Sequence, residues 1–204
     1  MAHPEGLSKE RIGTLFWPDA SPSELKTRFK NTIYRMRSAL NQEAIFFENE
    51  IYRFNWQLDY DYDLELFEDK VAEGNAATDP VLRIAAYTAA VHHYRGNYLS
   101  DVDADWCYAE RERLQRSFYT ITLTLAQLQY EASNLKTALD YCQRLLQDDP
   151  CLEDAHRLAM RIHSATGNRS AIARQFDRCR QALLEEIDAP PSPQTEKLYR
   201  SLMR

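Results

Sequence analysis

The sequence contains little glycine and no long apolar run. Five glycines among 204 residues disfavour a turn-rich all-β fold and favour helices. There is no run of 18 or more apolar residues, so we expect no membrane span. The first residues, MAHPEGLSKER, lack the apolar core of a signal peptide. A hydrophobic content of 44% still allows a sizeable core, so we expect a mainly α protein with one large domain or two smaller ones.

Cysteine is also scarce, and its spacing indicates no site. The four cysteines follow one another at spacings of 35, 9 and 28, and none forms a CxxC pair. They are Cys107, Cys142, Cys151 and Cys179. This pattern indicates neither a disulfide framework nor a zinc site. We expect reduced, partly buried thiols in a cytoplasmic protein.

Motifs of enzymes and of metal sites are missing as well. The sequence has no Walker A loop, no GxGxxG and no recognisable catalytic triad. His92 and His93 point about 100° apart on a helix and have no carboxylate or thiol four residues on, so we expect no metal there. The alternating aspartates at 59–63 lack the glycine and distal glutamate of a calcium loop and predict a short solvated strand. Those at 101–105 predict a polar turn and an N-cap. We expect a non-enzymatic protein without a cofactor.

Positive charge is concentrated in one predicted helix. Between Ser21 and Leu40 there are five basic residues and one acidic residue. The segment 1–58 holds eight Lys and Arg against seven Asp and Glu, whereas the remainder holds 17 against 24. One cationic helix in an otherwise acidic chain favours a polyanionic partner, most simply double-stranded DNA.

The spacing in this region predicts two helices. Ser8 is a candidate N-cap for a short first helix that Pro18 ends. Ser21 and Pro22 then open a second helix, over about 21–40, whose apolar residues recur every three or four positions. The opposite side mixes amide, hydroxyl, aromatic and guanidinium groups, which suits the base edges and phosphates of a major groove. The predicted DNA-binding residues are Thr27, Arg28, Lys30, Asn31, Tyr34, Arg35 and Arg37.

A β-hairpin is predicted after the basic helix, over about 44–55. The apolar runs Ile45–Phe47 and Ile51–Phe54 flank the polar tip Glu48–Glu50. Two helices followed by a hairpin form the last two-thirds of a winged helix-turn-helix. The tip is acidic, whereas a wing that touches phosphate would carry Lys or Arg.

From about residue 64 onward the pattern is helical and periodic. The predicted helices cover 64–74, 80–95, 105–132, 135–148, 152–166, 169–187 and 193–203. Glu131–Asn134 aligns with Ala165–Asn168 at an offset of 34, and Tyr94–Asn97 gives the same turn at an offset of 37 toward the N-terminus. A 34-residue helix-turn-helix period is typical of tetratricopeptide repeats. We therefore expect a tetratricopeptide-like solenoid.

These motifs resemble one family throughout. The N-terminal part resembles the response-regulator type of winged helix found in antibiotic regulatory (SARP-like) activators, at Leu7–Glu10, Leu15–Asp19, Ile33–Leu40 and Tyr52–Phe54. The remainder resembles the bacterial transcriptional activator domain, at Tyr94–Leu99, Trp106, Glu110–Leu114, Asp149–His156, Arg178–Leu183 and Pro191–Thr195. Asp188 stands where many relatives have glycine, so the last turn is expected to differ.

The resemblance also carries an expectation about the start of the chain. Family members have an N-terminal sheet and a first helix before the point that matches residue 1. We therefore expect a fragment of a longer protein. Without those elements, Ile12, Phe16 and Phe29 are expected to lose much of their cover.

Together these inferences define two domains and a function. Residues 1–58 are expected to form a partial winged helix, and residues 59–204 a tetratricopeptide-like activator domain. The resemblance implies a DNA-binding transcriptional regulator whose solenoid contacts a second protomer or RNA polymerase. The alternative is a protein–protein interaction module that does not bind DNA.

Overall fold

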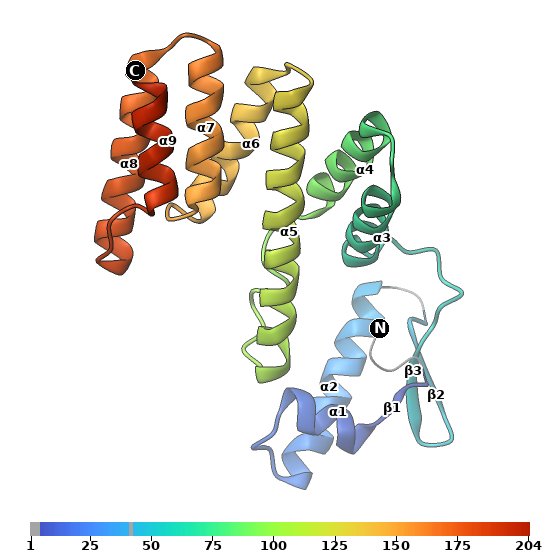
Figure 1. Cartoon of the computed structure of the whole chain (residues 1–204). Coiled ribbons are helices and arrows are strands. Elements are labelled where there is room, and N and C mark those ends of the chain that lie inside the picture. Colours follow the sequence, from blue (N-terminus) through green and yellow to red (C-terminus); the bar gives the residue numbers. More distant parts are fainter. Residues whose placement is uncertain (1–4, 41–42) are drawn as a thin grey trace. The chain divides into compact units, whose positions relative to one another are not determined.

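The computed structural model describes residues 5–40 and 43–204. The chain divides into two compact units, which we treat separately: residues 1–61 with 99–110, and residues 62–98 with 111–204. Figure 1 labels the elements along the chain. The domain division predicted at residue 58 stays a prediction, because compact packing does not test independent folding. The unexpected feature is that residues 99–110 pack with the N-terminal unit.

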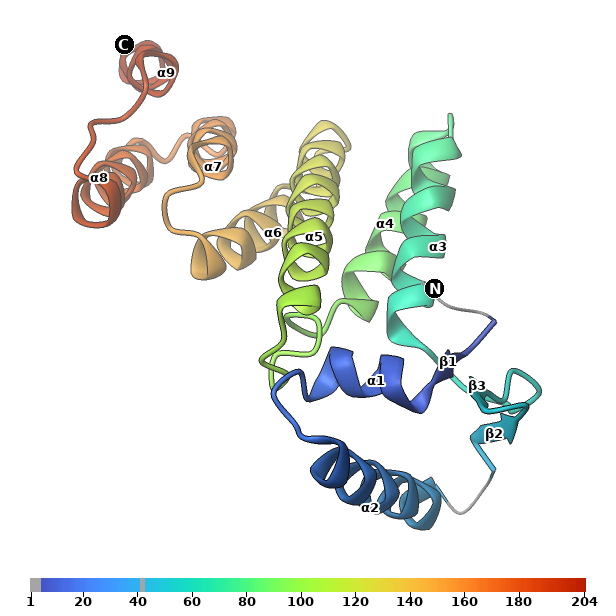
Figure 2. The same cartoon turned by 90° about the horizontal axis from the view of Figure 1, so that it is seen from below.

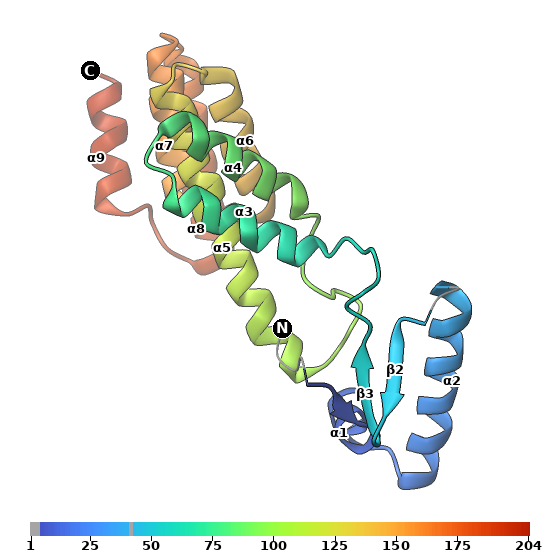
Figure 3. The same cartoon turned by 90° about the vertical axis from the view of Figure 1, so that its right-hand side faces the viewer.

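Among its described residues, the first unit contains two complete helices, a small sheet and the start of α5. Its elements are β1 (Leu7–Ser8), α1 (Lys9–Phe16), α2 (Pro22–Leu40), β2 (Ile45–Glu48) and β3 (Ile51–Phe54). The sheet is antiparallel with the order β1-β3-β2, and Figure 3 shows the hairpin beside α2. The sequence predicted both helices and the hairpin, but it did not predict β1. Strand β1 is only two residues long, which is too short for an alternating pattern to be recognised.

Side-chain caps define where the two helices begin. The Ser8 hydroxyl accepts a hydrogen bond from the Arg11 N–H at 3.2 Å, as predicted for an N-cap. At the start of α2, the Glu24 carboxylate accepts from the Ser21 N–H at 2.9 Å, and the Glu24 N–H donates to the Ser21 hydroxyl at 3.4 Å. This reciprocal pair is a capping box. It fixes the first turn of α2 immediately after the chain leaves α1.

Residues with positive φ form the hairpin turn of the sheet and the entry to β1. Asn49 and Glu50 both have positive φ, at 52° and 63°, which is the two-residue hairpin turn that matches strand twist. Gly6 has φ 87°, and a Cβ there would lie 2.5 Å from the Tyr52 carbonyl oxygen. Only glycine therefore lets the chain enter β1 this close to β3.

The second unit is helical. Its elements are α3 (Asp63–Ala76), α4 (Pro80–His93), most of α5 (Asp105–Glu131), α6 (Leu135–Asp148), α7 (Glu153–Ala165), α8 (Arg169–Ile187) and α9 (Pro193–Leu202). Figure 2 shows α5 to α9 following one another in a row. All seven predicted helices are present, with ends that differ by at most two residues. The predicted strand at 59–63 is wrong: residues 59–62 are irregular, Asp63 already begins α3, and Tyr60 packs its ring on Phe54 at 5.2 Å.

Two apolar clusters hold helices α3 to α7 together. Phe67, Tyr87, Phe118 and Leu125 belong to the larger one, which joins α3, α4, α5 and α6. The smaller one joins α5, α6 and α7 through small residues such as Ala126, Ala138 and Ala159, with the Cys142 thiol among them. Within α3 to α7 each helix thus covers the apolar face of its neighbour, as expected for stacked repeats.

The repeat is reproduced in the backbone. Ser133 and Gly167, which lie one repeat period apart, have φ of 62° and 70°. The residue after each donates its N–H to a carbonyl five positions earlier, Asn134 to Gln129 at 2.8 Å and Asn168 to His163 at 2.9 Å. Both turns are left-handed helix C-caps of the same type.

The third predicted copy of this turn is wrong. Gly96 has φ 146°, outside the left-handed helical region of the other two. The chain after it stays irregular to residue 104 instead of starting a helix. This segment leads to Trp106, whose indole N–H donates to the Leu15 carbonyl at 3.2 Å and whose ring packs edge-on against Phe16 at 5.6 Å. The loop therefore leads the chain to contacts within the first unit and does not form a repeat turn.

The motif Pro191–Thr195 fastens α9 to α7. Buried Arg157 donates to the Thr195 hydroxyl at 2.8 Å and lies 3.8 Å from the Glu153 carboxylate. The same carboxylate accepts from the Ser192 N–H and hydroxyl, at 3.0 and 2.7 Å. The charges are paired within a hydrogen-bonded network, which is the condition under which burying an arginine is tolerated.

A buried histidine links α7 to α8. The His156 Nε2–H donates to the Pro150 carbonyl at 2.9 Å, and Nδ1 accepts from the Gln175 amide at 2.6 Å. Burial lowers the pKa of His156 below its ordinary value. The ring is therefore neutral near pH 7, and both of its nitrogens have partners.

Replacing Ser133 with glycine should stabilise the protein. Glycine adopts the left-handed conformation without a Cβ clash, so we expect a gain of about 0.5–1 kcal/mol after the entropy of the unfolded chain is subtracted. Urea unfolding checks this value. Ser133→Ala should give no gain, and Gly167→Ala should lose about 1 kcal/mol. A loss of stability in Ser133→Gly would contradict the shared turn.

Stability should fall as the solution becomes more acidic than the ordinary histidine pKa. The unfolded chain takes up a proton at His156 that the folded chain resists. The free energy of unfolding therefore decreases as pH falls below about 6.5, by at most about 1.4 kcal/mol per pH unit. His156→Gln should flatten this slope between pH 7 and 5, in urea melts at each pH. Exposed His92→Gln is the control, and an equal flattening there would refute the assignment to His156.

Candidate nucleic-acid interface

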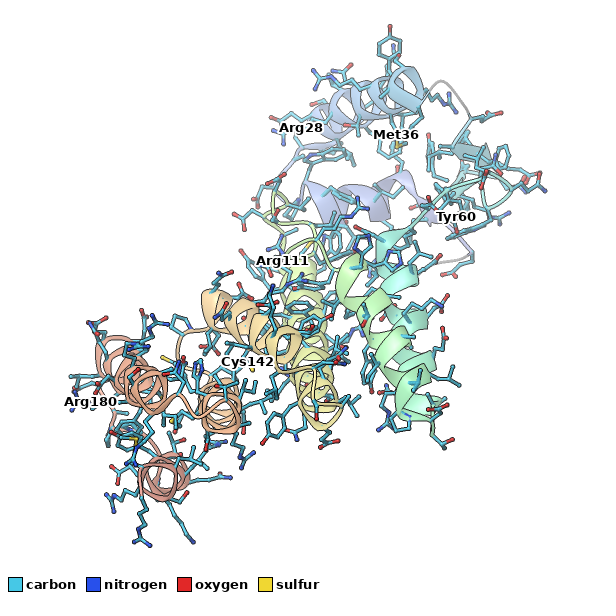
Figure 4. The ribbon with its side chains drawn as sticks, turned by 90° about the horizontal axis from the view of Figure 1, so that it is seen from above. Arg28, Met36, Tyr60, Arg111, Cys142 and Arg180 are labelled. Atoms are coloured by element: carbon cyan, nitrogen blue, oxygen red, sulfur yellow. The ribbon has the colours of Figure 1, made fainter. Side chains whose placement is uncertain are left out.

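Helix α2 has one packed side and one free side. On the packed side Phe29 is 5% exposed, and Leu25, Ile33 and Met36 are half-buried. All seven residues predicted to bind DNA are exposed, Tyr34 to 72%. Figure 4 shows Arg28 on the outer side of α2 and Met36 directed into the unit. The structure therefore brings the seven predicted residues onto one exposed surface.

Three contacts fix this orientation. The Phe29 ring meets Tyr52 of β3 edge-on, with centroids 4.7 Å apart. Gly13 of α1 is buried against α2, where an added Cβ would lie 2.5 Å from the Leu25 side chain. Near the other end of the helix, Arg37 donates to the Ile45 carbonyl of β2 at 3.5 Å. The helix is thus held by α1, by β3 and by the start of the hairpin.

We expected Ile12, Phe16 and Phe29 to lose much of their cover. This expectation is wrong for Phe29, because Tyr52 covers its ring. Ile12 is half-buried. Phe16 remains nearly half exposed even though it contacts Trp106. The sequence could not show these contacts, since they depend on how the hairpin and residues 99–110 fold back on α1 and α2.

A hollow of about 460 Å³ lies between α2 and the hairpin, and cations surround it. Lys26, Lys30 and Arg37 come from α2, and Lys9 comes from α1. Phe47 of β2, which is more than half exposed, forms part of its wall. The sequence prediction did not include Lys26 and Lys9. Lys26 could have been predicted, because it lies four residues before Lys30 on the same helix. Lys9 lies beside these cations only through tertiary structure.

The remaining arginines of α2 lie on its other flank. At about 100° per residue, Arg28 and Arg35 fall away from the hairpin, with Thr27 and Asn31 between the two flanks. Helix α2 therefore has a polar centre with positive charge on both sides. An anion that spans the helix would meet cations at both of its edges.

The tip of the hairpin is negatively charged. The Glu48 carboxylate lies 4.0 Å from the Arg53 guanidinium and is largely exposed. Glu50 lies in the exposed turn beside it. Carboxylates repel phosphate, so the exposed positive charge of this unit lies on α2 and around the hollow, and the tip does not add to it.

The cysteines and the acidic side chains were also considered as candidate sites. All four thiols are free and three are buried, and burial raises the pKa of Cys142 to about 12. Among the residues that the structure describes, no group of three or more His, Cys, Asp or Glu side chains could hold a metal ion. Within the same residues, no helix is long and apolar enough to cross a membrane.

Comparison with known families decides the class of the chain. The family model of the bacterial transcriptional activator domain matches residues 62–203. The chain belongs to this family. The resemblance inferred from Asp149–His156 and Pro191–Thr195 is therefore confirmed, and the role of the family is transcription regulation. The match begins three residues after the predicted start at residue 59.

A solved structure supports the fold over both units. The chain is similar to Mycobacterium tuberculosis EmbR in complex with a low affinity phosphopeptide, with a TM-score of 0.70 and 15% sequence identity. The likeness covers 98% of this chain and 55% of the EmbR chain, so this chain spans about half the length of EmbR. At this identity the likeness shows the fold alone, and it confirms the mainly α class. A comparison with curated protein sequences gave no match.

The two sides of α2 should respond differently to truncation. Phe29→Ala removes a buried aromatic side chain and should cost about 3–5 kcal/mol of the stability of this unit. Tyr34→Ala, five positions later on the same helix, should change stability by no more than about 0.5 kcal/mol. Thermal unfolding followed by tryptophan fluorescence measures both. Equal destabilisation by the two variants would show that the sides of the helix are wrongly assigned.

Proposed function

We propose that this chain is the DNA-binding and activator part of a bacterial transcriptional regulator, and that it acts without enzymatic chemistry. The observation that carries this proposal is the free side of α2, where seven polar and cationic side chains share one exposed surface. Membership of the activator-domain family supports the regulatory role. The fold it shares with EmbR supports a winged-helix interpretation of the first unit.

The dimensions of α2 suit a major groove. With 19 residues, the helix is about 28 Å long, and the groove is about 12 Å wide. Its central residues Thr27 and Asn31 would face base edges, where an asparagine amide pairs best with adenine. The two cationic flanks would meet the phosphates on either side of the groove. In this arrangement the flanks position the helix and its centre selects the sequence.

In the proposed complex, the phosphodiester backbone of one strand would lie in the hollow beside the hairpin. Lys9, Lys26, Lys30 and Arg37 surround a space of about 460 Å³, and their positive charge would neutralise phosphates of one strand. The exposed ring of Phe47 would pack against the sugars of that strand. The acidic tip would lie away from the phosphates, so the base of the hairpin contributes to binding and Glu48 and Glu50 do not.

The activator domain is proposed to make protein contacts. Its partner would be a second protomer or RNA polymerase, because stacked helices offer extended surfaces for protein contacts. The alternative function is an interaction module in which α2 does not bind DNA. The acidic balance of residues 59–204, with 17 basic against 24 acidic side chains, is the observation that favours this alternative.

Titration of the 204-residue chain against promoter fragments at two salt concentrations separates the two functions. A regulator should bind with a sequence preference, and its affinity should fall steeply with salt. Arg35→Ala/Arg37→Ala removes one cation from each flank and should reduce the slope of log K against log salt by about 2. Lys136→Gln/Arg174→Gln removes two exposed cations of the solenoid and should leave the slope unchanged. Binding without salt dependence would contradict the proposal.

Asn31→Ala should change specificity more than general affinity. Loss of the amide should reduce discrimination at one base pair about 5- to 150-fold, while binding to unrelated DNA stays within about twofold. Competition between the best site and its single-base variants measures this. If Asn31→Ala weakens all sequences equally, the centre of α2 does not read bases.

A further inference from the structure

The hollow between α2 and the hairpin has an aromatic wall beside its cations. The wall includes the rings of Phe29 and Tyr34 from α2 and those of Phe47 and Tyr52 from the hairpin. Phe47 packs on Tyr52, with centroids 4.4 Å apart and ring planes tilted by 31°, yet its side chain stays 55% exposed. Phenylalanine is usually buried in proteins. The exposed part of this ring is therefore an available stacking surface inside the hollow.

The cations of α2 form a row along this wall. Lys26, Lys30 and Arg37 lie on one side of the helix and extend over about 16 Å of its length. Among the described residues, none of these three has a carboxylate within ion-pair distance. Lys9 is paired with Glu10 at 3.3 Å. No acidic side chain is among the described residues that line the hollow, so its positive charge is uncompensated and favours a polyanion.

A base-paired duplex leaves the aromatic wall largely unused. In a duplex the faces of the bases are stacked on one another, and only the base edges reach the grooves. An unpaired strand presents the faces themselves. Proteins that bind single strands combine a cationic groove, which follows the backbone, with aromatic side chains on which bases stack. The hollow has both parts, because its exposed ring lies beside a row of unpaired cations.

We propose that this hollow is a binding site for single-stranded DNA. One unpaired base stacks on the exposed ring of Phe47, and the phosphates of the same strand follow the row from Lys26 to Arg37. At about 3.4 Å per nucleotide of a stacked strand, the row spans about five nucleotides. A volume of about 460 Å³ lies within the range of small-ligand sites and holds one base. The inference rests on the proposed function for the source of the strand, a promoter whose strands have separated.

The test is fluorescence anisotropy of a labelled oligothymidylate of about 12 nucleotides, titrated with the 204-residue chain. Phe47→Leu removes the aromatic face but keeps an apolar side chain, and it should lower the affinity at least about fivefold. The matched control is Phe46→Leu, because Phe46 is the preceding residue of β2, points to the other face of the sheet and does not line the hollow. It should change the affinity less than about twofold. Circular dichroism melts establish that both variants are folded.

The row of cations is tested through the salt dependence of the same titration. Lys26→Gln/Lys30→Gln should weaken binding and reduce the slope of log K against log salt by about 1.4, because each phosphate contact with a single strand contributes about 0.7. Lys136→Gln/Lys197→Gln removes two exposed lysines of the solenoid and should leave the slope unchanged. A slope that both double variants reduce equally would contradict a site in the hollow.

Titration of promoter duplex with the same samples separates this site from the proposed function. Phe47→Leu should weaken duplex binding less than single-strand binding, because leucine still packs against sugars. The inference is overturned if the oligothymidylate does not bind, if Phe47→Leu and Phe46→Leu have equal effects, or if poly-glutamate at equal charge displaces the strand. Single-strand binding without sequence-preferring duplex binding would refute the proposed function and keep the site. Duplex binding without single-strand binding would do the reverse.

Discussion

The contact between Phe29 and Tyr52 determines which side of α2 remains free. The helix has an apolar stripe and a polar, cationic stripe, and either could in principle face outward. The aromatic pair, 4.7 Å between centroids, buries the first, and Gly13 lets α1 approach closely enough to close the same side. Everything proposed for the N-terminal unit depends on the apolar side of α2 being buried and the cationic side being exposed. Reversal of the packing would bury several cations without partners, at a prohibitive cost.

The solenoid depends on a different constraint, the end of each helix. A left-handed residue recurs at Ser133 and Gly167, and another ends α8 at Asp188. Each one ends its helix and turns the chain, so that the next helix can pack on the last. Only one of the three is glycine, which shows that the turn is imposed by the packing of the flanking helices and not by the local preference of the residue. The Arg157 network then fixes α9, which has few apolar residues of its own to bury.

Much of the fold could be predicted because it is periodic. Helix positions follow the spacing of apolar residues, and the turn at Ser133–Asn134 follows from its copy at Gly167–Asn168. The predictions that were wrong concern places where long-range contacts override local pattern. Gly96 looks like another repeat turn, but the chain there leads to Trp106, whose partner Leu15 is far away along the sequence. The alternation at 59–63 looks like a strand, but aromatic packing of Tyr60 takes precedence.

In the candidate site too, some residues could be predicted from local pattern and others depend on long-range contacts. The seven exposed residues of α2 follow from helical geometry, which the sequence contains. Lys9 joins Lys26 and Lys30 only because α1, α2 and the hairpin meet around one hollow, and no spacing in the sequence shows that. The cover over Phe29 was missed for the same reason, since Tyr52 comes from a later strand.

The chain passes from one compact unit to the other three times, after residues 61, 98 and 110. No single cut therefore separates the two units. A fragment that ends near residue 61 keeps both helices and the hairpin but loses Trp106, the hydrogen-bond partner of Leu15 and neighbour of Phe16. A fragment that starts there carries residues 99–110 without the surface on which they pack. Gene fusion or domain exchange at residue 61 would thus transfer an incomplete unit. The basic helix and the solenoid are therefore expected to be inherited together.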